Sequence, residues 1–285
     1  MIGTFLISID EQRLFYASRH LRQHGLSFEH IRGCVGRDIP SWLARDFAGS
    51  SALTDGEVGC YAAHLKVAQA IVARRLSHAL VVEDDVLICV PDLEARISKA
   101  VRAAPADWDL IQLGGVFVKG AMVEVDTLGF MSHLVRYRRM PMNTAAYVLS
   151  NAGARKLLNA GPRPYAIDVD ISYPWQRDIN VYGVFPSLVA QAAGTSIIGE
   201  RPKTSRAPFL GRIRNDLHFM RKVGLGRFLH ALFLDTRNSY RRRTGSPLDV
   251  TFNVIMGNEA PNHGEDPDPG PDHGVSESPG VHYLH

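Results

Sequence analysis

Three adjacent carboxylates, Glu83, Asp84 and Asp85, follow directly after an apolar run at residues 79 to 82. Such a group is costly without a cation, because like charges raise one another's pKa and burial adds a desolvation penalty. Hard oxygen ligands favour Mg²⁺ or Mn²⁺, which bind one or two carboxylates together with phosphate oxygens of a substrate. The triplet therefore predicts a site for a divalent metal and a nucleotide diphosphate, and its alternative is a solvated acidic strand end.

The run before the triplet has the character of a central strand. Residues 79 to 82 are continuously apolar, as are strands of a parallel sheet that are covered on both faces. In open α/β sheets, ligands bind beyond the carboxyl ends of the strands, where the triplet falls. A metal held there would act as a Lewis acid and neutralise the charge that develops on a diphosphate as its bond to a sugar breaks.

Strand and helix patterns alternate around this run. Residues 3 to 9 predict a strand, and the helical pattern that follows stops at Gly25. Thr54, with Glu57 three residues later, has the pattern of a capping box and predicts a helix that extends to Arg75. Similar patterns predict strands at 28 to 35 and 110 to 113 and helices at 93 to 104 and 151 to 158, and a further segment at 144 to 149 continues the alternation. The alternation predicts an α/β fold with a mostly parallel central sheet.

The composition is that of an ordinary globular protein. The chain has 285 residues, 45% of them hydrophobic, which suffices to bury one substantial core. Its three cysteines, Cys34, Cys60 and Cys89, are odd in number and form no CxxC pair, which favours a reducing cytoplasm. We expect no secretion, because the first ten residues lack the pattern of a signal peptide. No run reaches the roughly 20 apolar residues that cross a bilayer, so any membrane contact is expected to be peripheral.

The net charge of +3 is unevenly distributed. Residues 201 to 243 carry twelve basic side chains against two acidic ones, with apolar residues at helical spacing. We expect two amphipathic helices, broken near Gly224 and Gly226, that contact an anionic membrane surface. Nucleic acid is the rival partner, and it is disfavoured because no stacking platform or recognised nucleic-acid motif accompanies the arginines. Residues 258 to 285 are rich in Pro, Gly, Asp and His and are predicted to be disordered.

Several longer stretches resemble the signature of one enzyme family. They are LTDGEVGCYAAH at 53 to 64, ALVVEDDV at 79 to 86, DWDLIQLG at 107 to 114 and TAAYVLS at 144 to 150, followed by Ile167 and Asp168. Over roughly residues 3 to 191 the chain resembles glycosyltransferase family 25, which includes bacterial lipooligosaccharide β-galactosyltransferases. One departure is Ala63, where the family usually has a serine before the histidine.

This resemblance implies a GT-A type nucleotide-binding domain at residues 1 to 200, followed by the basic helical segment at 201 to 257 and the tail at 258 to 285. It implies an inverting enzyme that moves a sugar, with galactose expected, from a UDP-sugar to a glycan acceptor. The expected acceptor is a lipooligosaccharide or another glycan, expected to be lipid-linked. The expected location is the cytoplasm, with peripheral contact to the inner face of the inner membrane. The implied role is lipopolysaccharide biosynthesis in the cell envelope.

The acidic triplet corresponds to the family's DxD metal motif. Carried onto this chain, Asp85 and Glu83 are the expected ligands of Mn²⁺ or Mg²⁺, and Asp84 is expected to contact the donor. An inverting transfer also needs a carboxylate that takes the proton of the acceptor hydroxyl. Asp168 matches the family's late acidic position and is the first candidate for this base, with Asp170 second. Helix capping is the alternative role for both.

Further site residues are expected outside the triplet. The expected donor-binding residues are Ile7, Ser8, Ile9, Gly56, Glu57 and His64, and Gln191 is an additional site residue whose role is open. The first three end the first strand and would line the base and ribose pocket by analogy with the fold. His64 would donate to the diphosphate, or would be a satisfied core histidine.

Two literal DxD strings compete with the triplet, one at Asp107 and Asp109 and one at Asp168 and Asp170. The first pair precedes a strand and is expected at its amino end, the wrong edge for ligand binding, so a structural role is predicted. Two other functions stay open for the chain. A glycoside hydrolase with paired carboxylates would need no nucleotide, and a noncatalytic nucleotide- or glycan-binding protein, which Ala63 favours slightly, would bind UDP without turnover.

Overall fold

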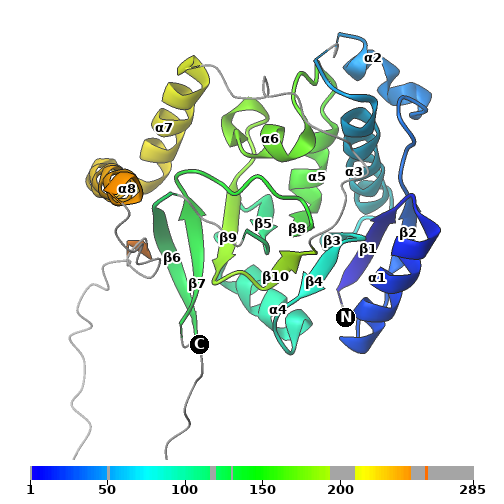
Figure 1. Cartoon of the computed structure of the whole chain (residues 1–285), viewed down its shortest axis with the longest axis horizontal. Helices are drawn as coiled ribbons and strands as arrows, with labels where there is room; N and C mark the ends of the chain where they lie inside the picture. The colour runs from blue at the N-terminus through cyan, green and yellow to red at the C-terminus, as the bar shows by residue number, and fades with distance from the viewer. Residues whose placement is uncertain are drawn as a thin grey trace, which may run out of the picture.

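The protein is described here from a computed structural model. The structure describes residues 2–49, 52–115, 120–129, 131–192, 209–244 and 254–255. Figure 1 shows one central sheet with helices packed on both of its faces and a pair of helices at one end. The predicted tail at 258 to 285, and the predicted boundary at residue 200, lie outside the described residues.

The central sheet has nine strands in the order β11-β6-β7-β9-β5-β8-β3-β1-β2. In chain order the strands are β1 (Gly3–Ser8), β2 (Glu29–Arg32), β3 (His78–Glu83), β5 (Leu110–Gln112), β6 (Met122–Gly129), β7 (Ser132–Tyr137), β8 (Ala146–Ser150), β9 (Val181–Phe185) and β11 (Val254–Ile255). The pairings make β7 and β8 antiparallel to their neighbours, and the other strands all point the same way. The predicted α/β class with a mostly parallel central sheet is confirmed.

Helices cover the two faces of the sheet. They are α1 (Glu11–Gln23), α2 (Ala44–Phe47), α3 (Asp55–Ala73), α4 (Leu93–Ala103), α5 (Asn151–Leu158) and α6 (Ile167–Ile171), with short 3-10 turns at Ser41–Leu43 and Pro174–Gln176. Alternate residues of β3 enter different cores: Ala79 and Val81 pack with α3 and α5, whereas Leu80 and Val82 pack with α1 and α4. Because β3 is buried on both faces, its sequence is continuously apolar until the strand ends.

Helix α3 begins where its sequence pattern predicts. The Thr54 hydroxyl accepts a hydrogen bond from the Glu57 backbone N–H at 3.2 Å, and the Glu57 carboxylate accepts one from the Thr54 backbone N–H at 2.9 Å. This reciprocal capping box satisfies backbone N–H groups that have no partner within the helix. It fixes the amino end of α3 beside the carboxyl end of β3, so that one turn of α3 faces the acidic triplet.

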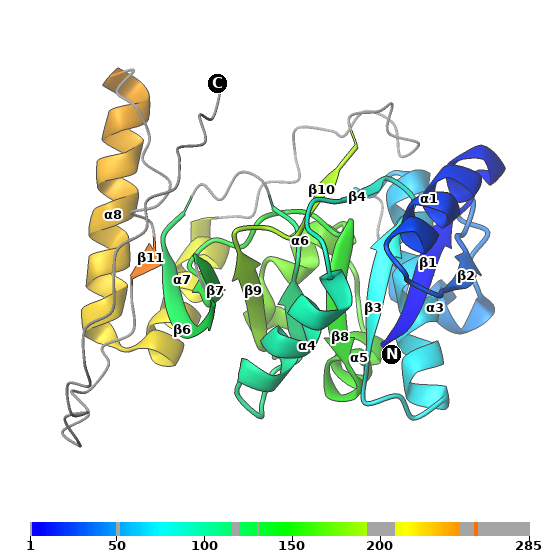
Figure 2. The ribbon, with the colours of Figure 1, turned by 90° about the horizontal axis from the view of Figure 1, so that it is seen from below.

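The basic segment forms two helices, α7 (Phe209–Val223) and α8 (Leu225–Thr244), as predicted. Gly224 separates them with a φ of +85°, a backbone conformation that favours glycine. Figure 2 shows both helices at the end of the molecule next to β6, far from β1 and β2. Phe219 of α7 and Leu234 of α8 pack there on Val123. Among the helices of the described residues, none is long and apolar enough to cross a membrane.

Candidate active site

A large cavity of about 980 Å³ lies at the carboxyl ends of β1 and β3. Its lining includes these predicted site residues: Ile7, Ser8, Ile9, Gly56, Glu57, His64, Glu83, Asp84, Asp85, Asp168 and Gln191. The loop after β3 continues into a short second sheet formed by β4 (Val86–Ile88) and β10 (Val189–Gln191), which brings Gln191 beside the triplet. Segments far apart in the chain thus meet at the sheet edge where ligands bind in α/β folds.

Glu83 forms a hydrogen bond with a histidine of α3. Its Oε1 atom lies 3.0 Å from Nε2 of His64, and Nδ1 of His64 lies 2.9 Å from the Tyr147 hydroxyl. An ionised carboxylate only accepts hydrogen bonds, so Nε2 donates to Glu83, and in a neutral imidazole Nδ1 then accepts from the Tyr147 hydroxyl. Burial raises the pKa of Glu83, but hydrogen bonds from His64 and Thr144 outweigh burial, and the pKa lies below its ordinary value. Glu83 is therefore a well-compensated anion.

Asp84 is compensated less completely. The Ser8 hydroxyl donates to it at 2.6 Å, and the Arg13 guanidinium lies 2.5 Å from its Oδ1 atom. Burial is the largest influence on its pKa and raises it, and the charges of Asp85 and Glu83 add to this, so that the pKa stays above its ordinary value despite Ser8 and Arg13. Ionised Asp84 is therefore held at a free-energy cost.

Asp85 is the least satisfied member of the triplet. Its Oδ2 atom accepts a hydrogen bond of 2.9 Å from the Gln191 amide and lies 3.2 Å from Arg13. Its Oδ1 atom is buried and has no hydrogen-bond partner among the described residues. Burial raises the pKa of Asp85, and the Glu83 charge raises it further. A buried oxygen without a partner is the feature expected where a cation binds.

These three carboxylates do not fit a metal equally well. Asp85, with an unpartnered oxygen and a raised pKa, fits the hard oxygen ligands that Mn²⁺ and Mg²⁺ prefer, and Asp84 lies next to it. Glu83 is engaged by His64 instead, so the geometry favours Asp85 over Glu83 for direct ligation. The predicted metal role of both residues stays a prediction.

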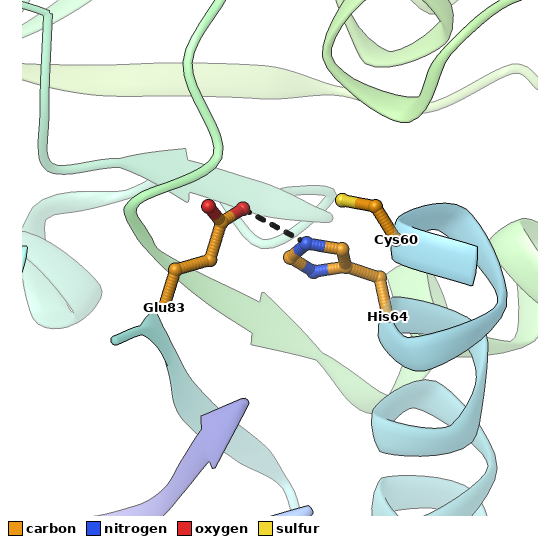
Figure 3. A group of neighbouring side chains, drawn as sticks. All are labelled: Cys60, His64 and Glu83. Carbon is orange, nitrogen blue, oxygen red and sulfur yellow. Dashed lines mark hydrogen bonds and ion pairs between the residues drawn. The ribbon is translucent and has the colours of Figure 1, made fainter. Parts of the chain in front are cut away.

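Figure 3 shows a second arrangement of possible ligands, in which the Cys60 thiol, the His64 ring and the Glu83 carboxylate converge. Their ligand atoms all lie within 4.8 Å of one another. Cys60 and His64 come from successive turns of α3, and Gly59 lets this helix approach the loop before it: a Cβ there would lie 2.4 Å from the Cys34 carbonyl oxygen. The sulfur and nitrogen donors make this group chemically distinct from the oxygen ligands of Asp84 and Asp85.

The two candidate bases on α6 lie in different surroundings. Asp168 lines the cavity, is 5% exposed, and its Oδ1 atom accepts a hydrogen bond of 2.9 Å from the Val169 backbone N–H. Asp170 is outside the cavity lining, and its Oδ2 atom pairs with Arg177 at 2.6 Å and accepts a hydrogen bond from Tyr61. The geometry favours Asp168 as the base that reaches an acceptor.

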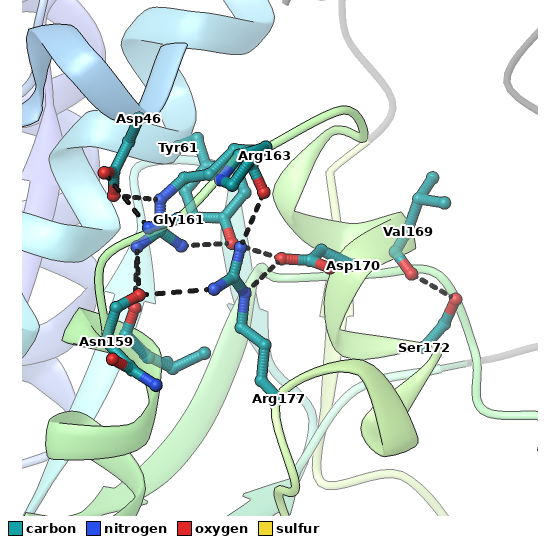
Figure 4. A network of polar contacts seen from close by, with 11 residues as sticks. Asp46, Tyr61, Asn159, Gly161, Arg163, Val169, Asp170, Ser172 and Arg177 are labelled. Atoms are coloured by element: carbon teal, nitrogen blue, oxygen red, sulfur yellow. Dashed lines mark hydrogen bonds and ion pairs between the residues drawn. The ribbon is translucent and has the colours of Figure 1, made fainter.

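Asp170 belongs to a buried polar network that Figure 4 shows. Arg163, which is 1% exposed, donates to the Tyr61 hydroxyl at 2.8 Å and pairs with Asp46 at 3.0 Å. Burial raises the pKa of Tyr61, so its hydroxyl keeps the proton that it donates to Asp170. This network joins α2, α3 and α6, and its carboxylates already have cationic partners within the protein.

The other DxD string is structural, as predicted. Asp109 precedes β5 and is 1% exposed. Its Oδ2 atom pairs with Lys156 at 2.6 Å and accepts a hydrogen bond of 2.7 Å from the Asn180 backbone N–H. Asn143, Thr144 and Cys60 also line the cavity, although the sequence assigned them no role in the site. Thr144 and Cys60 lie within the stretches that resemble the family signature, whereas Asn143 lies outside them.

The fold and this cavity define the class of the protein: an α/β protein with a ligand site of clustered carboxylates at the carboxyl edge of its sheet. The particular family follows from comparison with known proteins. The family model for glycosyltransferase family 25 (LPS biosynthesis protein) matches residues 1–172. The chain belongs to glycosyltransferase family 25, and the predicted family membership is confirmed.

Known relatives resemble the first part of the chain. It is 33% identical over 174 residues to "Probable inactive glycosyltransferase 25 family member 3" of Bos taurus, which covers 55% of this chain and 28% of that protein. It is 32% identical over 133 residues to "Procollagen galactosyltransferase 2" of Homo sapiens, covering 46% of this chain and 21% of that protein. The chain thus spans only about a quarter of the length of these curated relatives.

Among solved structures, the chain resembles a glycosyltransferase involved in the glycosylation of the major capsid of PBCV-1. The TM-score is 0.34 and the sequence identity is 10%, over 77% of this chain and 100% of that chain. The description of the fold therefore depends on the sheet order and pairings of the chain itself.

Proposed function

We propose that the protein is an inverting glycosyltransferase that moves a sugar, with galactose expected, from a UDP-sugar to a glycan acceptor. The observation that carries this proposal is the incompletely compensated pair Asp84 and Asp85 at the carboxyl end of β3, on a cavity of about 980 Å³. Membership of glycosyltransferase family 25 supports the reaction class. A divalent cation would supply the positive charge that this site lacks, and the oxygens of a bound diphosphate would be further ligands of that cation.

In the proposed reaction, the Asp168 carboxylate takes the proton of an acceptor hydroxyl, and that oxygen attacks the anomeric carbon of the donor sugar. The new carbon–oxygen bond forms on the face opposite the UDP, and the bond from the sugar to the β-phosphate oxygen breaks. UDP leaves with both electrons of that bond. When bound, Mn²⁺ or Mg²⁺ would neutralise the charge on this leaving group, held by Asp85 with Asp84 beside it.

Arg13 adds a second source of positive charge. Its guanidinium contacts both Asp84 and Asp85 and lines the cavity. A guanidinium presents several N–H donors and can bind a carboxylate and a phosphate oxygen together. Arg13 would thus keep the two carboxylates ionised in the absence of donor and contact the diphosphate in its presence. His64, whose ring nitrogens are both engaged, would position Glu83.

The test is a screen of UDP-sugars and other nucleotide sugars for slow hydrolysis, with and without Mn²⁺. We expect release of UDP that depends on the metal, and loss of this activity in Asp85→Ala. Asp126→Ala, on the exposed part of β6, is the matched control that should keep it. Full activity of a correctly folded Asp85→Ala variant, judged by circular dichroism, would contradict the proposal.

The same screen separates the alternatives. Binding of UDP with Mn²⁺ without hydrolysis or transfer would favour the noncatalytic binding protein, a possibility that the name of the Bos taurus relative makes worth testing. Cleavage of glycosides without any nucleotide would favour the hydrolase.

We further propose that the acceptor is lipid-linked and that α7 and α8 contact the membrane surface. Apolar side chains at helical spacing are exposed on both helices: Leu210, Ile213 and Leu217 on α7, and Leu225, Leu229, Leu232 and Phe233 on α8. Exposed arginines, among them Arg214 and Arg227, lie between them. This combination suits a surface of anionic lipid, in which the apolar residues insert and the arginines meet the headgroups.

Flotation with lipid vesicles tests this contact. We expect the protein to float with vesicles that contain phosphatidylglycerol, and the Leu229→Ser/Phe233→Ser variant to float much less. Phe15→Ser is the matched control, because Phe15 is as exposed as Phe233, 63% in each case, but lies on α1 at the other end of the molecule. Equal flotation of all three proteins would contradict the membrane contact.

A further inference from the structure

A second cavity, of about 710 Å³, adjoins the first. It extends between the loop that follows β7 and helix α7. Met142, Asn143 and Gln191 line both cavities, so the two share a wall.

Hydrogen bonds connect this shared wall to Asp85 of the acidic triplet. The Asn143 amide contacts Oε1 of Gln191 at 3.4 Å, and the Gln191 amide donates to Asp85 at 2.9 Å. The Asn143 side chain is fixed in turn, because its Oδ1 atom accepts a hydrogen bond of 2.7 Å from the Ala145 backbone N–H. A molecule bound in the second cavity would therefore lie next to the residues that contact a donor in the first. In a sugar transfer, the acceptor has to lie next to the donor.

The second cavity carries positive charge without a partner. Arg139 and Arg212 line it and are exposed, and neither forms an ion pair within the part of the chain that the structure describes. Asp216 also lines the cavity, and its carboxylate pairs at 2.9 Å with Arg138, which pairs with Asp235 as well. Two arginines against one aspartate still leave the lining with a net positive charge. Arginines without partners on a cavity wall suit an anionic group of a ligand, which they can bind through two N–H donors each.

Tyr173 lines the second cavity together with the two arginines. Burial raises the pKa of its hydroxyl, while the charges of Arg212 and Arg139 act in the opposite direction. Both guanidinium groups are thus close enough to act on one phenol. An aromatic ring beside two cations offers an apolar face for a sugar ring and charge for a substituent on it.

We propose that the second cavity binds the acceptor and selects a sugar that carries an anionic substituent, a phosphate or a carboxylate, through Arg139 and Arg212. This inference rests on the proposed function, because it assigns the acceptor of that transferase. It narrows the acceptor from any glycan to an acidic one.

The test measures binding of three small probes to the full chain by protein-observed NMR, with UDP and the diamagnetic Mg²⁺ present. The probes are glucose, glucose 6-phosphate and glucuronate, which differ in the anionic substituent. We expect at least one anionic probe to bind about tenfold more tightly than glucose or better, as charge-assisted hydrogen bonds allow. We expect this advantage to disappear in Arg139→Ala and in Arg212→Ala.

Arg102→Ala is the matched control, because Arg102 is an exposed arginine of α4 without an ion pair among the described residues. It should keep the preference for the anionic probe. A preference for glucose 6-phosphate alone would assign a phosphate, and a preference for glucuronate alone would assign a carboxylate. Equal affinities for all three probes, or an anionic preference that survives both cavity variants, would overturn the inference.

Titration of UDP in the same samples distinguishes a failure of the acidic-acceptor inference from a failure of the proposed function. If UDP binds to the wild-type protein and no probe is preferred, only the assignment of an acidic acceptor is wrong. If UDP itself does not bind, the donor site proposed at Asp84 and Asp85 is wrong. Both arginines are exposed, so their variants are expected to fold, and thermal unfolding checks this directly.

Discussion

Helix α3 borders two groups of carboxylates that the protein compensates differently. In the first group, Asp46 pairs with the buried Arg163, Asp170 pairs with the half-buried Arg177, and Tyr61 links the two pairs. In the second group, Asp84 and Asp85 are half-buried and share Arg13 as their one cationic partner among the described residues, and Oδ1 of Asp85 has no hydrogen-bond partner among them. We call the first group the closed cluster and the second the open cluster.

The difference between the clusters separates structure from function. A buried charge is stable only when it is paired and hydrogen-bonded, and the closed cluster achieves this with side chains of the protein alone. The open cluster does not, and burial leaves the pKa of both its aspartates raised. Because the described residues do not supply the missing partners, we expect a bound ligand to supply them.

The largest effect is expected from breaking the closed cluster. Arg163→Met leaves Asp46 buried without its cation, so we expect the free energy of unfolding to fall by about 3–5 kcal/mol. Urea unfolding monitored by circular dichroism measures this loss. Arg102→Met, a change of the same kind on the surface of α4, serves as control and should cost almost nothing. A stable Arg163→Met protein would mean that the closed cluster does not hold α2, α3 and α6 together.

The two aspartates of α6 should respond differently to the same substitution. Asp168→Asn removes the proposed base, and we expect sugar transfer to slow by about a hundredfold or more with little change in stability. Asp170→Asn weakens the closed cluster, so we expect a lower melting temperature as its main effect. Transfer rates and thermal unfolding of both variants make the test. If Asp170→Asn alone abolished transfer in a stable protein, the assignment of the base would be reversed.

Glu83 belongs to the triplet but is compensated by His64, so it should behave like the closed cluster. Its pKa is lowered because hydrogen bonds from His64 and Thr144 outweigh burial. A carboxyl with a lowered pKa in the folded state adds stability above its unfolded-state pKa and loses it as the pH falls through the folded value. We expect Glu83→Gln to cost about 1–3 kcal/mol at neutral pH. This cost should shrink below about pH 4 in urea unfolding, and a difference independent of pH would contradict the account.

The smallest expected effect is a change in stability that has opposite signs in the open and the closed cluster. Burial raises the pKa of Asp85, so its ionisation destabilises the folded state as the pH rises through that value. In metal-free protein at neutral pH, Asp85→Asn should raise stability by on the order of 1 kcal/mol, or roughly 2–4 °C in Tm. The matched variant in the closed cluster, Asp46→Asn, should lower Tm. Thermal unfolding in EDTA measures both, and a lower Tm for Asp85→Asn would count against an open cluster.

Much of the fold and the open cluster could be predicted from sequence, because their signals are local. The apolar run that ends at Glu83 predicts β3, and the capping box of Thr54 and Glu57 predicts the start of α3. Each pattern predicts one end of an element from a few residues. Because ligands bind beyond the carboxyl ends of the strands in α/β sheets, the triplet is then predicted to lie in a ligand site. The two basic helices also follow from spacing alone.

The rest depends on contacts that no local pattern carries. The hairpin of β6 and β7 was not predicted, nor was the antiparallel direction of β8. Thr144, just before β8, hydrogen-bonds Glu83, and Tyr147 of β8 contacts His64. Asp170 resembles Asp168 in sequence, and only the positions of Arg177 and Tyr61 show that it is already paired. Arg139 and Arg212 lie far apart in the chain. They line the same cavity because α7 lies beside the loop after β7.

The most direct test of the open cluster is the affinity of UDP measured by titration calorimetry in EDTA and in Mn²⁺. For the wild-type protein we expect Mn²⁺ to tighten UDP binding by about tenfold or more. Each factor of ten in affinity corresponds to about 1.4 kcal/mol of binding free energy. For Asp85→Asn we expect the same weak affinity in both buffers. An equal gain from Mn²⁺ in both proteins would contradict the central claim, because the cation would then bind without the Asp85 carboxylate, whose Oδ1 atom has no partner among the described residues.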